Sequence, residues 1–122
     1  MDNKEYKTFL KEKVYRFSLA IIRFIDQLDK KDFSVQVIVR QMLRSATSIG
    51  ANIIEAQACG SKKDFTNFIN IALKSANETK YWLALLRDSG KGDRVAINKL
   101  LVEVTEIANL LGSSILKFKG RK

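Results

Sequence analysis

The sequence predicts an all-α protein: an antiparallel up-down-up-down four-helix bundle that forms a single domain over residues 1–122. Three observations support this prediction. The 122 residues include no proline, a residue that costs about 3 kcal/mol inside a helix. Apolar residues recur at steps of three and four in four long segments, as they do along one face of a helix. Short connections between the segments place consecutive helices antiparallel.

The first helix is expected from about Lys4 to Lys30. Its core face consists of Tyr6, Leu10, Val14, Phe17, Ile21, Ile25 and Leu28. The opposite side carries Arg16, Arg23 and Lys30 at intervals of seven residues. Because seven residues rotate a helix to within about 20° of the starting direction, the three cations form a row. Such a row suits either an ordinary solvated face or contact with a polyanion.

The second helix begins at a cap, Asp32 or Ser34, and runs to a turn at residues 57–60. Its core face consists of Val35, Ile38, Met42, Ser45, Ile49, Ile53 and Ala56. A second apolar column, containing Ala46, makes the apolar sector wider than the interior of one bundle requires. A glycine on the same side suggests close approach of another backbone. We therefore predict contact with a neighbouring subunit through Val39, Leu43, Gly50 and Ile54.

The third helix starts at a capping sequence, Ser61 followed by Asp64, and continues to about Asp88. Its expected core face is Phe65, Phe68, Ala72, Ser75, Thr79, Trp82, Leu83 and Leu86. The fourth helix follows a natural cap, Asp93, and extends to about Lys119. Its core face alternates steps of four and three, the period of helical bundles. That face consists of Ile97, Leu101, Val104, Ala108, Leu111, Ile115 and Phe118.

Glu78 is the main polar exception on these faces, because it shares a helical column with Ile71 and Leu85. A buried carboxylate without a partner is costly, so Glu78 requires one. A turn centred near residue 59 or 60 places Glu78 opposite Arg40 and Gln41. We therefore predict a buried polar network between the second and third helices. Its members are Arg40, Arg44, Ser48, Asn52, Glu55, Ser75 and Glu78.

The same register places Ser75 opposite Arg44. One interpretation of the network is a site for a cation or a polar ligand. The other is a set of hydrogen bonds and ion pairs that fixes the register of two helices. We favour the structural interpretation because the chain has no histidine and few catalytic groups. Di-metal carboxylate bundles need Glu-x-x-His pairs, so we expect no metal, no cofactor and no enzymatic activity.

The net charge of +9, from 22 basic and 13 acidic residues, favours polyanions as partners. Lysine outnumbers arginine, which suits contact with phosphates better than the reading of bases. The alternative is that the cations only keep the surface soluble. The candidate contacts to RNA or DNA are Arg16, Arg23, Lys30, Lys62, Lys63, Lys74, Lys80, Arg87, Lys117, Lys119, Arg121 and Lys122.

The remaining composition suggests a cytoplasmic protein without a membrane partner. One cysteine, Cys59, cannot form an internal disulfide and suits a reducing compartment. The first residues lack the apolar segment of a signal peptide. No apolar run approaches the ~18 residues that a membrane span needs.

A resemblance to a known family is carried by residues 41–44 and 48–55, then by Phe65, Phe68, Ile71, Ala72, Ser75 and Glu78. These segments resemble the four-helix-bundle proteins of the 23S rRNA intervening-sequence type. Residues 61–65 and 72–83 resemble one common branch of that family. The likeness covers nearly the whole chain and departs from the family pattern at Gly50, where proline is frequent, and at Ala56, where glycine is usual.

This resemblance implies a bundle that assembles as a ring, typically a homopentamer, with no established enzymatic activity. A related bundle is the accessory variability protein of diversity-generating retroelements, which partners a reverse transcriptase and its RNA. Two functions therefore remain open: a homo-oligomer that binds RNA or DNA, and a protein-interaction scaffold or accessory subunit, for example of a reverse transcriptase. A third, an enzyme using Arg44, Asn52, Glu55 and Glu78, is disfavoured.

Overall fold

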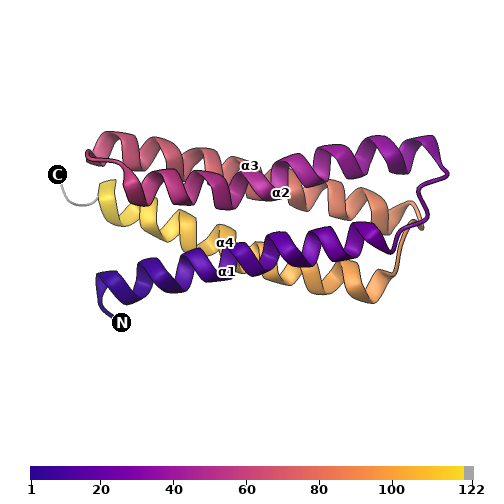
Figure 1. Ribbon diagram of the computed structural model, residues 1–122, viewed down its shortest axis with the longest axis horizontal. Coiled ribbons are helices and arrows are strands. Elements are labelled where there is room, and N and C mark those ends of the chain that lie inside the picture. Colours follow the sequence, from indigo (N-terminus) through magenta and orange to yellow (C-terminus); the bar gives the residue numbers. More distant parts are fainter. Residues whose placement is uncertain (120–122) are drawn as a thin grey trace.

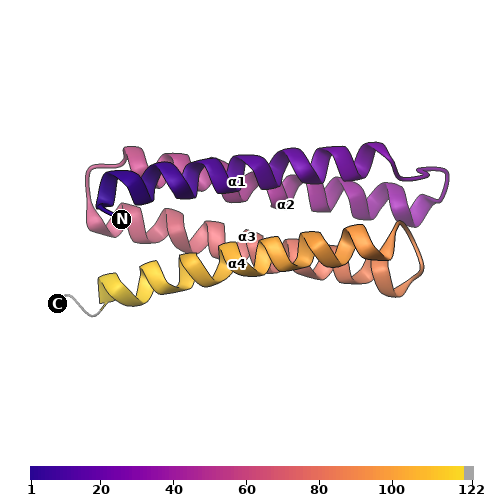
Figure 2. The same cartoon turned by 90° about the horizontal axis from the view of Figure 1, so that it is seen from below.

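The computed structural model consists of four helices: α1 (Asn3–Asp26), α2 (Phe33–Ala58), α3 (Lys62–Asp88) and α4 (Arg94–Lys119). The structure describes residues 1–119, with side chains to residue 116. Each helix contacts its two neighbours in the ring α1–α2–α3–α4, and consecutive helices run in opposite directions (Figure 1). The view from below shows α1 and α4 side by side, with the α3–α4 connection at the end far from the N-terminus (Figure 2). The predicted fold class is confirmed.

Side chains at the helix starts explain where the helices begin. The Asp2 carboxylate accepts a hydrogen bond from the Glu5 amide at 2.7 Å, and Ser61 Oγ accepts one from the Asp64 amide at 3.1 Å. Asp93 accepts from the amides of residues 95 and 96. Asp32 precedes α2 but makes no capping bond, and its carboxylate instead pairs with Lys91 Nζ at 2.5 Å. Side-chain oxygens satisfy amides that have no partner inside the helix.

The end of α1 differs from the prediction, because the helix stops at Asp26 rather than near Lys30. Lys30 Nζ instead donates to the carbonyl oxygens of Ile25 and Leu28, at 2.8 and 3.0 Å. It thereby satisfies carbonyl groups that the end of a helix leaves without partners. Lys30 is thus a helix cap and not the last member of a helical row.

The core stripe of α3 is narrower and more regular than predicted. Its buried residues are Ile69, Ala72, Ala76, Thr79, Leu83 and Leu86, which alternate steps of three and four. Phe65, Phe68 and Trp82 flank this stripe and are only half-buried. The large aromatic rings of these residues cover the core from flanking positions. The prediction used hydrophobicity alone and therefore placed the three residues at the centre of the core face. The polar Ser75 is likewise half-buried at the flank.

The other helices show smaller differences from the predicted core. On α1, α2 and α4 most predicted core residues are buried, and Tyr6, Ile25, Leu28, Ile38 and Leu101 are partly buried against them. Leu100 and Ile107 are buried although they were not predicted to be, and the side chain of Phe118 lies outside the described residues. None of the described helices is long and apolar enough to span a bilayer.

The α3–α4 connection packs against the end of α1. Gly90 and Gly92 have φ angles of +75° and +79°, in the region that favours glycine. A Cβ atom on Gly92 would lie 2.8 Å from Leu28 Cδ2 and 3.2 Å from Phe24 Cζ. Both backbone conformation and space therefore require glycine at this position.

Candidate functional site

The polar side chains between α2 and α3 form a line that we call the polar seam. It comprises Gln41, Arg44, Ser45, Ser48, Asn52, Ser75, Glu78, Thr79 and Trp82. Arg44 and Glu78 form an ion pair at the outer edge of the seam. Arg44 also donates to Gln41 Oε1 at 3.2 Å, and Trp82 Nε1 donates to Glu78 Oε2 at 3.3 Å. Glu78 therefore has the partners that its position on α3 requires.

The Arg44–Glu78 ion pair is not buried. The side chain of Arg44 is 60% exposed and that of Glu78 is 38% exposed. The column of Glu78 flanks the core stripe, and its other members, Ile71 and Leu85, are also exposed. The predicted burial of this carboxylate is wrong, because the column faces the edge of the α2–α3 interface and not its centre.

Three more predicted members of the network come together deeper in the seam. Ser75 Oγ donates to Ser48 Oγ at 3.0 Å. Asn52 Nδ2 donates to the Ser48 carbonyl oxygen at 2.8 Å and lies 3.0 Å from Ser48 Oγ. Arg40 and Glu55 are exposed, and neither belongs to an ion pair within the described part of the chain. The predicted network is thus smaller and more solvated than expected.

The register of α2 against α3 differs from the predicted one by about one helical turn. Glu78 pairs with Arg44 instead of Arg40, and Ser75 pairs with Ser48 instead of Arg44. Side chains lean toward the N-terminus of their own helix. On α2 they lean away from the turn, and on α3 they lean toward it. Each α3 side chain therefore meets a later α2 residue than the backbone level alone indicates.

A buried hydroxyl pair, Ser45 and Thr79, is the contact that sequence reasoning missed. Both residues have no exposed surface, and their hydroxyl oxygens lie 2.8 Å apart. Ser45 Oγ is also 3.1 Å from the Met42 carbonyl oxygen, and Thr79 Oγ1 is 2.8 Å from that of Ser75. The two hydroxyl protons can form only two of these three hydrogen bonds at a time. When the two hydroxyls are bonded to each other, either Thr79 donates to Ser45 and Ser45 to the Met42 carbonyl, or Ser45 donates to Thr79 and Thr79 to the Ser75 carbonyl. The only available signal was that both residues fall on facing core stripes.

The cation row predicted on α1 is shorter than expected, because Arg16 and Arg23 lie on this helix and Lys30 lies beyond its end. Arg16 lies 3.2 Å from the carboxylate of Glu12, and Lys30 caps the helix. Arg23 is exposed. It has no carboxylate within ion-pair distance in the described part of the chain. Arg16 is therefore paired with a carboxylate, whereas Arg23 and Lys30 have none within ion-pair distance among the described residues.

The α3 cations divide into a free set and an engaged set. Lys62, Lys63 and Lys74 are exposed, and none of them pairs with a carboxylate of residues 1–116. Lys80 is half-buried. The tail candidates cannot be placed in either set, because Arg121, Lys122 and the side chains of Lys117 and Lys119 lie outside the described residues.

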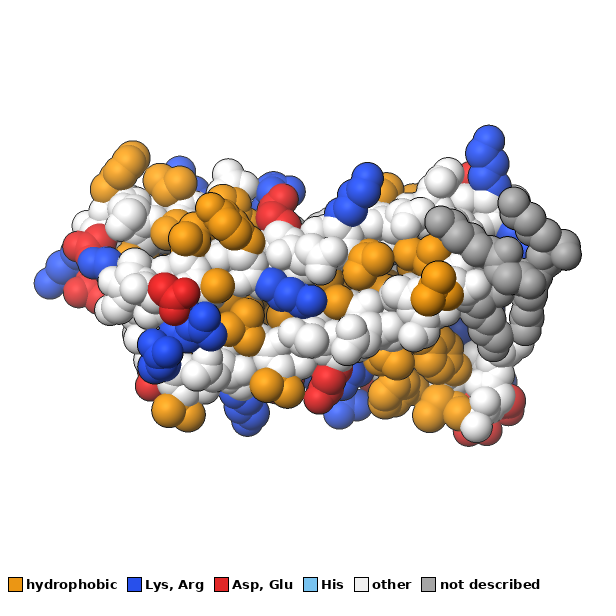
Figure 3. All heavy atoms as spheres, turned by 180° about the vertical axis from the view of Figure 1, so that it is seen from behind, with side chains coloured by type: hydrophobic (Ala, Val, Ile, Leu, Met, Phe, Trp, Pro, Cys, Tyr) orange, Lys and Arg blue, Asp and Glu red, His pale blue; other side chains and the backbone are white. Residues whose placement is uncertain are grey.

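Arg87 belongs to the engaged set. Its Nε lies 2.9 Å from Asp88 Oδ1, and its Nη1 donates to Asn98 Oδ1 at 3.0 Å. The hydrogen bond with Arg87 lowers the pKa of the Asp88 carboxyl below its ordinary value, and the charges of Arg87 and Arg94 act in the same direction. Burial opposes this shift. On the face seen from behind, Lys and Arg side chains are interspersed with hydrophobic and acidic ones (Figure 3).

An apolar groove of about 500 Å³ lies between α1 and α2, and Tyr15, Ser18, Gly50 and Ile54 line it. A Cβ atom on Gly50 would meet Val14 Cγ2 at 3.6 Å and Ser18 Oγ at 3.8 Å, which are ordinary contacts. Gly50 therefore opens the groove, and no close backbone forces glycine here within one chain.

The predicted interface residues have different positions relative to this groove. The side chains of Leu43 and Ile54 are exposed. Val39 is only 7% exposed and packs inside the bundle, so it is not available to a second subunit. The second apolar column of α2 is thus divided between the core and the surface.

The chain is similar to known proteins both in sequence and in fold. The chain matches the family described as 23S rRNA-intervening sequence protein over residues 7–113. It is also similar to a crystal structure from Bacteroides thetaiotaomicron, described as a protein with unknown function from the S23 ribosomal protein family. The identity is 44%, the TM-score is 0.80, and the alignment covers 87% of this chain and 97% of that chain. No curated protein matches. Because the family match covers most of the residues, the chain belongs to the 23S rRNA-intervening sequence proteins.

Proposed function

We propose that this protein is a non-enzymatic, homo-oligomeric bundle that binds RNA or another nucleic acid through contacts with phosphates. The net charge of +9 is the observation that carries the proposal. Lys62, Lys63 and Lys74 contribute exposed charges without a carboxylate partner among the described residues. Lysines that contact phosphates release counterions, which provides affinity without sequence preference.

The salt dependence of RNA binding tests this proposal. Fluorescence anisotropy of a labelled structured RNA should show affinity that falls steeply with salt and varies little with sequence. Lys63→Gln and Lys74→Gln should each reduce the slope of log K against log salt by about 0.7–0.9 if the lysine contacts a phosphate.

Lys91→Gln is the matched control for those variants. It removes the same unit charge, but Lys91 Nζ is already 2.5 Å from an Asp32 carboxylate oxygen. Its salt slope should therefore change less than those of the Lys63 and Lys74 variants. Absence of RNA binding at low salt, or an equal effect of all three variants, contradicts the proposal of phosphate contacts.

The α1–α2 groove supports the homo-oligomeric part of the proposal. Tyr15 and Ile54 line the groove and are 65% and 45% exposed. A second copy of the chain that covered the groove would remove this apolar surface from water, which is favourable. Sedimentation velocity should show an oligomer that Tyr15→Glu and Ile54→Glu weaken. Val102→Glu, a control at a 59% exposed position on α4, should leave it intact. A wild-type protein that stays monomeric at high concentration contradicts self-association.

Exposed apolar residues on α3 favour a second candidate function, that of an accessory subunit for another protein, such as a reverse transcriptase. Ile71, Tyr81 and Leu85 are exposed on this helix. A partner retained on immobilised protein after nuclease treatment and lost with Leu85→Glu would support this candidate. Release of every partner by nuclease would favour nucleic-acid binding instead.

A further inference from the structure

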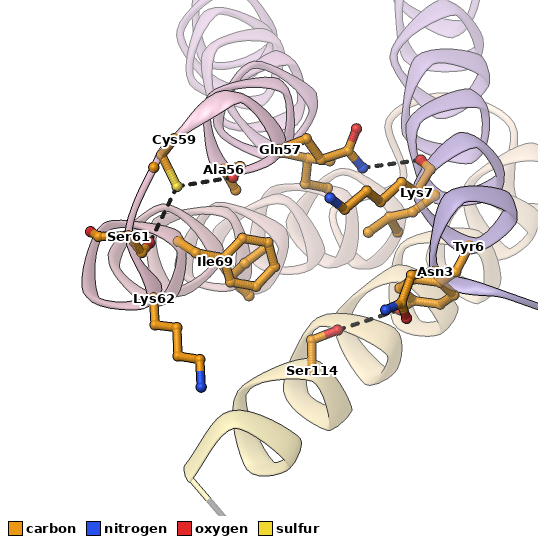
Figure 4. A pocket seen from close by; sticks show the side chains of 14 residues that line it. Asn3, Tyr6, Lys7, Ala56, Gln57, Cys59, Ser61, Lys62, Ile69 and Ser114 are labelled. Carbon is orange, nitrogen blue, oxygen red and sulfur yellow. Dashed lines mark hydrogen bonds between the residues drawn. The ribbon is translucent and has the colours of Figure 1, made fainter. Parts of the chain in front are cut away.

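A cavity of about 440 Å³ lies at the end of the bundle where α2 connects to α3. Leu10, Ile53, Ala56 and Ile69 line it with buried apolar side chains that belong to the core. Polar groups from α1, α2 and α4 line the remainder, including Tyr6, Gln57 and Ser114 (Figure 4). An apolar cavity of this size with a few convergent polar groups is typical of small-molecule sites.

The charge around this cavity has one sign. Lys7 from α1 and Lys62 from α3 line it, and no described lining residue carries a carboxylate. A second cavity of about 440 Å³ at the opposite end of the bundle is lined by three aspartates, including Asp29 and Asp32, and by one lysine. The two ends therefore differ in the charge of the ligand that they suit.

A hydroxyl group at the cavity also has hydrogen-bonding capacity to spare. Tyr6 Oη lies 3.4 Å from Ser114 Oγ, which is long for a hydrogen bond between hydroxyls. Ser114 Oγ donates its own proton to the Leu110 carbonyl oxygen at 3.0 Å. The Tyr6 proton is thus held weakly and is available to an acceptor in the cavity.

The wall beside Tyr6 is held in place by a bond between helices. Gln57 Nε2 at the end of α2 donates to the Lys7 carbonyl oxygen on α1 at 3.0 Å (Figure 4). This bond joins two of the helices that line the cavity. The cavity is therefore a built feature of the fold and not a gap between unconnected segments.

We propose that this cavity binds an amphipathic anion, a small molecule with an apolar body and one negatively charged head group. The apolar body packs against the wall that Leu10, Ile53 and Ile69 form, and burial of the ligand's own apolar surface contributes about 25 cal/mol per Å². The head group lies between the ammonium groups of Lys7 and Lys62, since charge-assisted hydrogen bonds are stronger than neutral ones. Of the residues named for nucleic-acid binding, Lys62 also lines the cavity, whereas Lys63 and Lys74 do not.

The only cysteine of the chain provides a direct readout of occupancy. Cys59 lines the cavity, is half-buried, and donates through its thiol to the Ala56 carbonyl oxygen at 3.0 Å. A ligand in the cavity should slow alkylation of Cys59 by iodoacetamide, an uncharged reagent. Sodium decanoate and decyl phosphate serve as probes with different anionic head groups. Each should bind the full chain saturably by calorimetry, with one site per chain, and should slow the alkylation.

Matched variants and probes separate the site from nonspecific adsorption. The double variant Lys7→Gln, Lys62→Gln should weaken decanoate binding by about tenfold or more. The double variant Lys63→Gln, Lys74→Gln also removes two exposed charges, at positions on α3 that do not line the cavity, and should change the affinity less than about twofold. Circular dichroism checks that both variants remain helical.

Three results would overturn the proposal. The first is decyltrimethylammonium or decanol binding as tightly as decanoate, because then the lysines select nothing. The second is unchanged decanoate affinity in the Lys7→Gln, Lys62→Gln variant. The third is absence of saturable binding or of Cys59 protection by either anion at about 1 mM. None of these measurements contains RNA. A failure of the RNA-binding proposal therefore does not change their expected results, and the two proposals can fail separately.

Discussion

Replacement of Glu78 by glutamine should reduce the free energy of unfolding by less than about 1 kcal/mol. The Arg44–Glu78 pair joins α2 to α3, but its two side chains are 60% and 38% exposed. Water screens a pair at this exposure, and such pairs contribute about 0.2–1 kcal/mol. Glutamine retains an oxygen that accepts a hydrogen bond from Trp82 or Arg44, so the substitution removes mainly the charge.

Urea unfolding at two salt concentrations measures this contribution. Circular dichroism follows the whole bundle, and the fluorescence of Trp82, the only tryptophan, reports on the seam itself. At about 1 M salt the Debye length falls to about 3 Å, so the difference between wild type and Glu78→Gln should shrink. Arg44→Gln should have a similar effect, and combining the two substitutions should add little, because either one removes the same pair.

A large effect would refute this reasoning. Breaking a buried ion pair costs about 3–5 kcal/mol, because one charge remains without a partner away from water. If Glu78→Gln failed to fold, or lost more than about 3 kcal/mol independently of salt, the carboxylate would behave as a buried group. The two side chains would then be less accessible to water than their exposed fractions indicate.

Four further predictions concern single residues. Ser45→Ala should cost about 1 kcal/mol in urea unfolding, because its hydroxyl partner keeps a carbonyl acceptor; a loss above about 3 kcal/mol would indicate an unsatisfied buried group. Gly112→Ala should raise the thermal midpoint, because the new Cβ meets no described atom within 4 Å in the helix interior. Gly92→Ala should lower it, because φ is +79° there; the reverse order would contradict this account. Arg87→Gln should raise the pKa of Asp88 toward its ordinary value in a carboxyl NMR titration, and an unchanged pKa would show that Arg87 does not cause the shift.

The pH dependence associated with Asp88 follows from the direction of its shift. Its pKa in the folded chain is lower than its ordinary value. The charged carboxylate therefore favours folding above the ordinary pKa, and this stabilisation is lost as the pH falls through the lower, folded value. Arg87→Gln should remove that part of the acid sensitivity.

Local features of the fold were predictable because their causes lie within a few residues. Ser61 accepts the predicted kind of capping bond from the Asp64 amide, three residues later. The end of α1 was not predictable in the same way. Lys30 caps that helix, and Leu28 lies beside Gly92 from a connection more than 60 residues later in the chain. Contacts of this kind are decided by which distant segment packs nearby.

The candidate site shows the same division. The residue types that pair across α2 and α3 were identified from their unusual positions, and Ser48, Asn52 and Ser75 do come together. Their exact partners and burial were not predictable from spacing. The lean of side chains along each helix shifts the register, and a flanking position leaves Glu78 partly in water.

The sequence by itself determined that this protein is four antiparallel helices with an excess of positive charge. Helical period, the absence of proline and capping residues act over one or two turns, so they can be read without knowing the neighbours. Only the tertiary structure decided that Val39 lies in the core, that Lys30 caps α1 and that a cavity with two lysines opens at one end. These depend on how four helices rotate and slide against one another, which is set by packing between residues far apart in the chain.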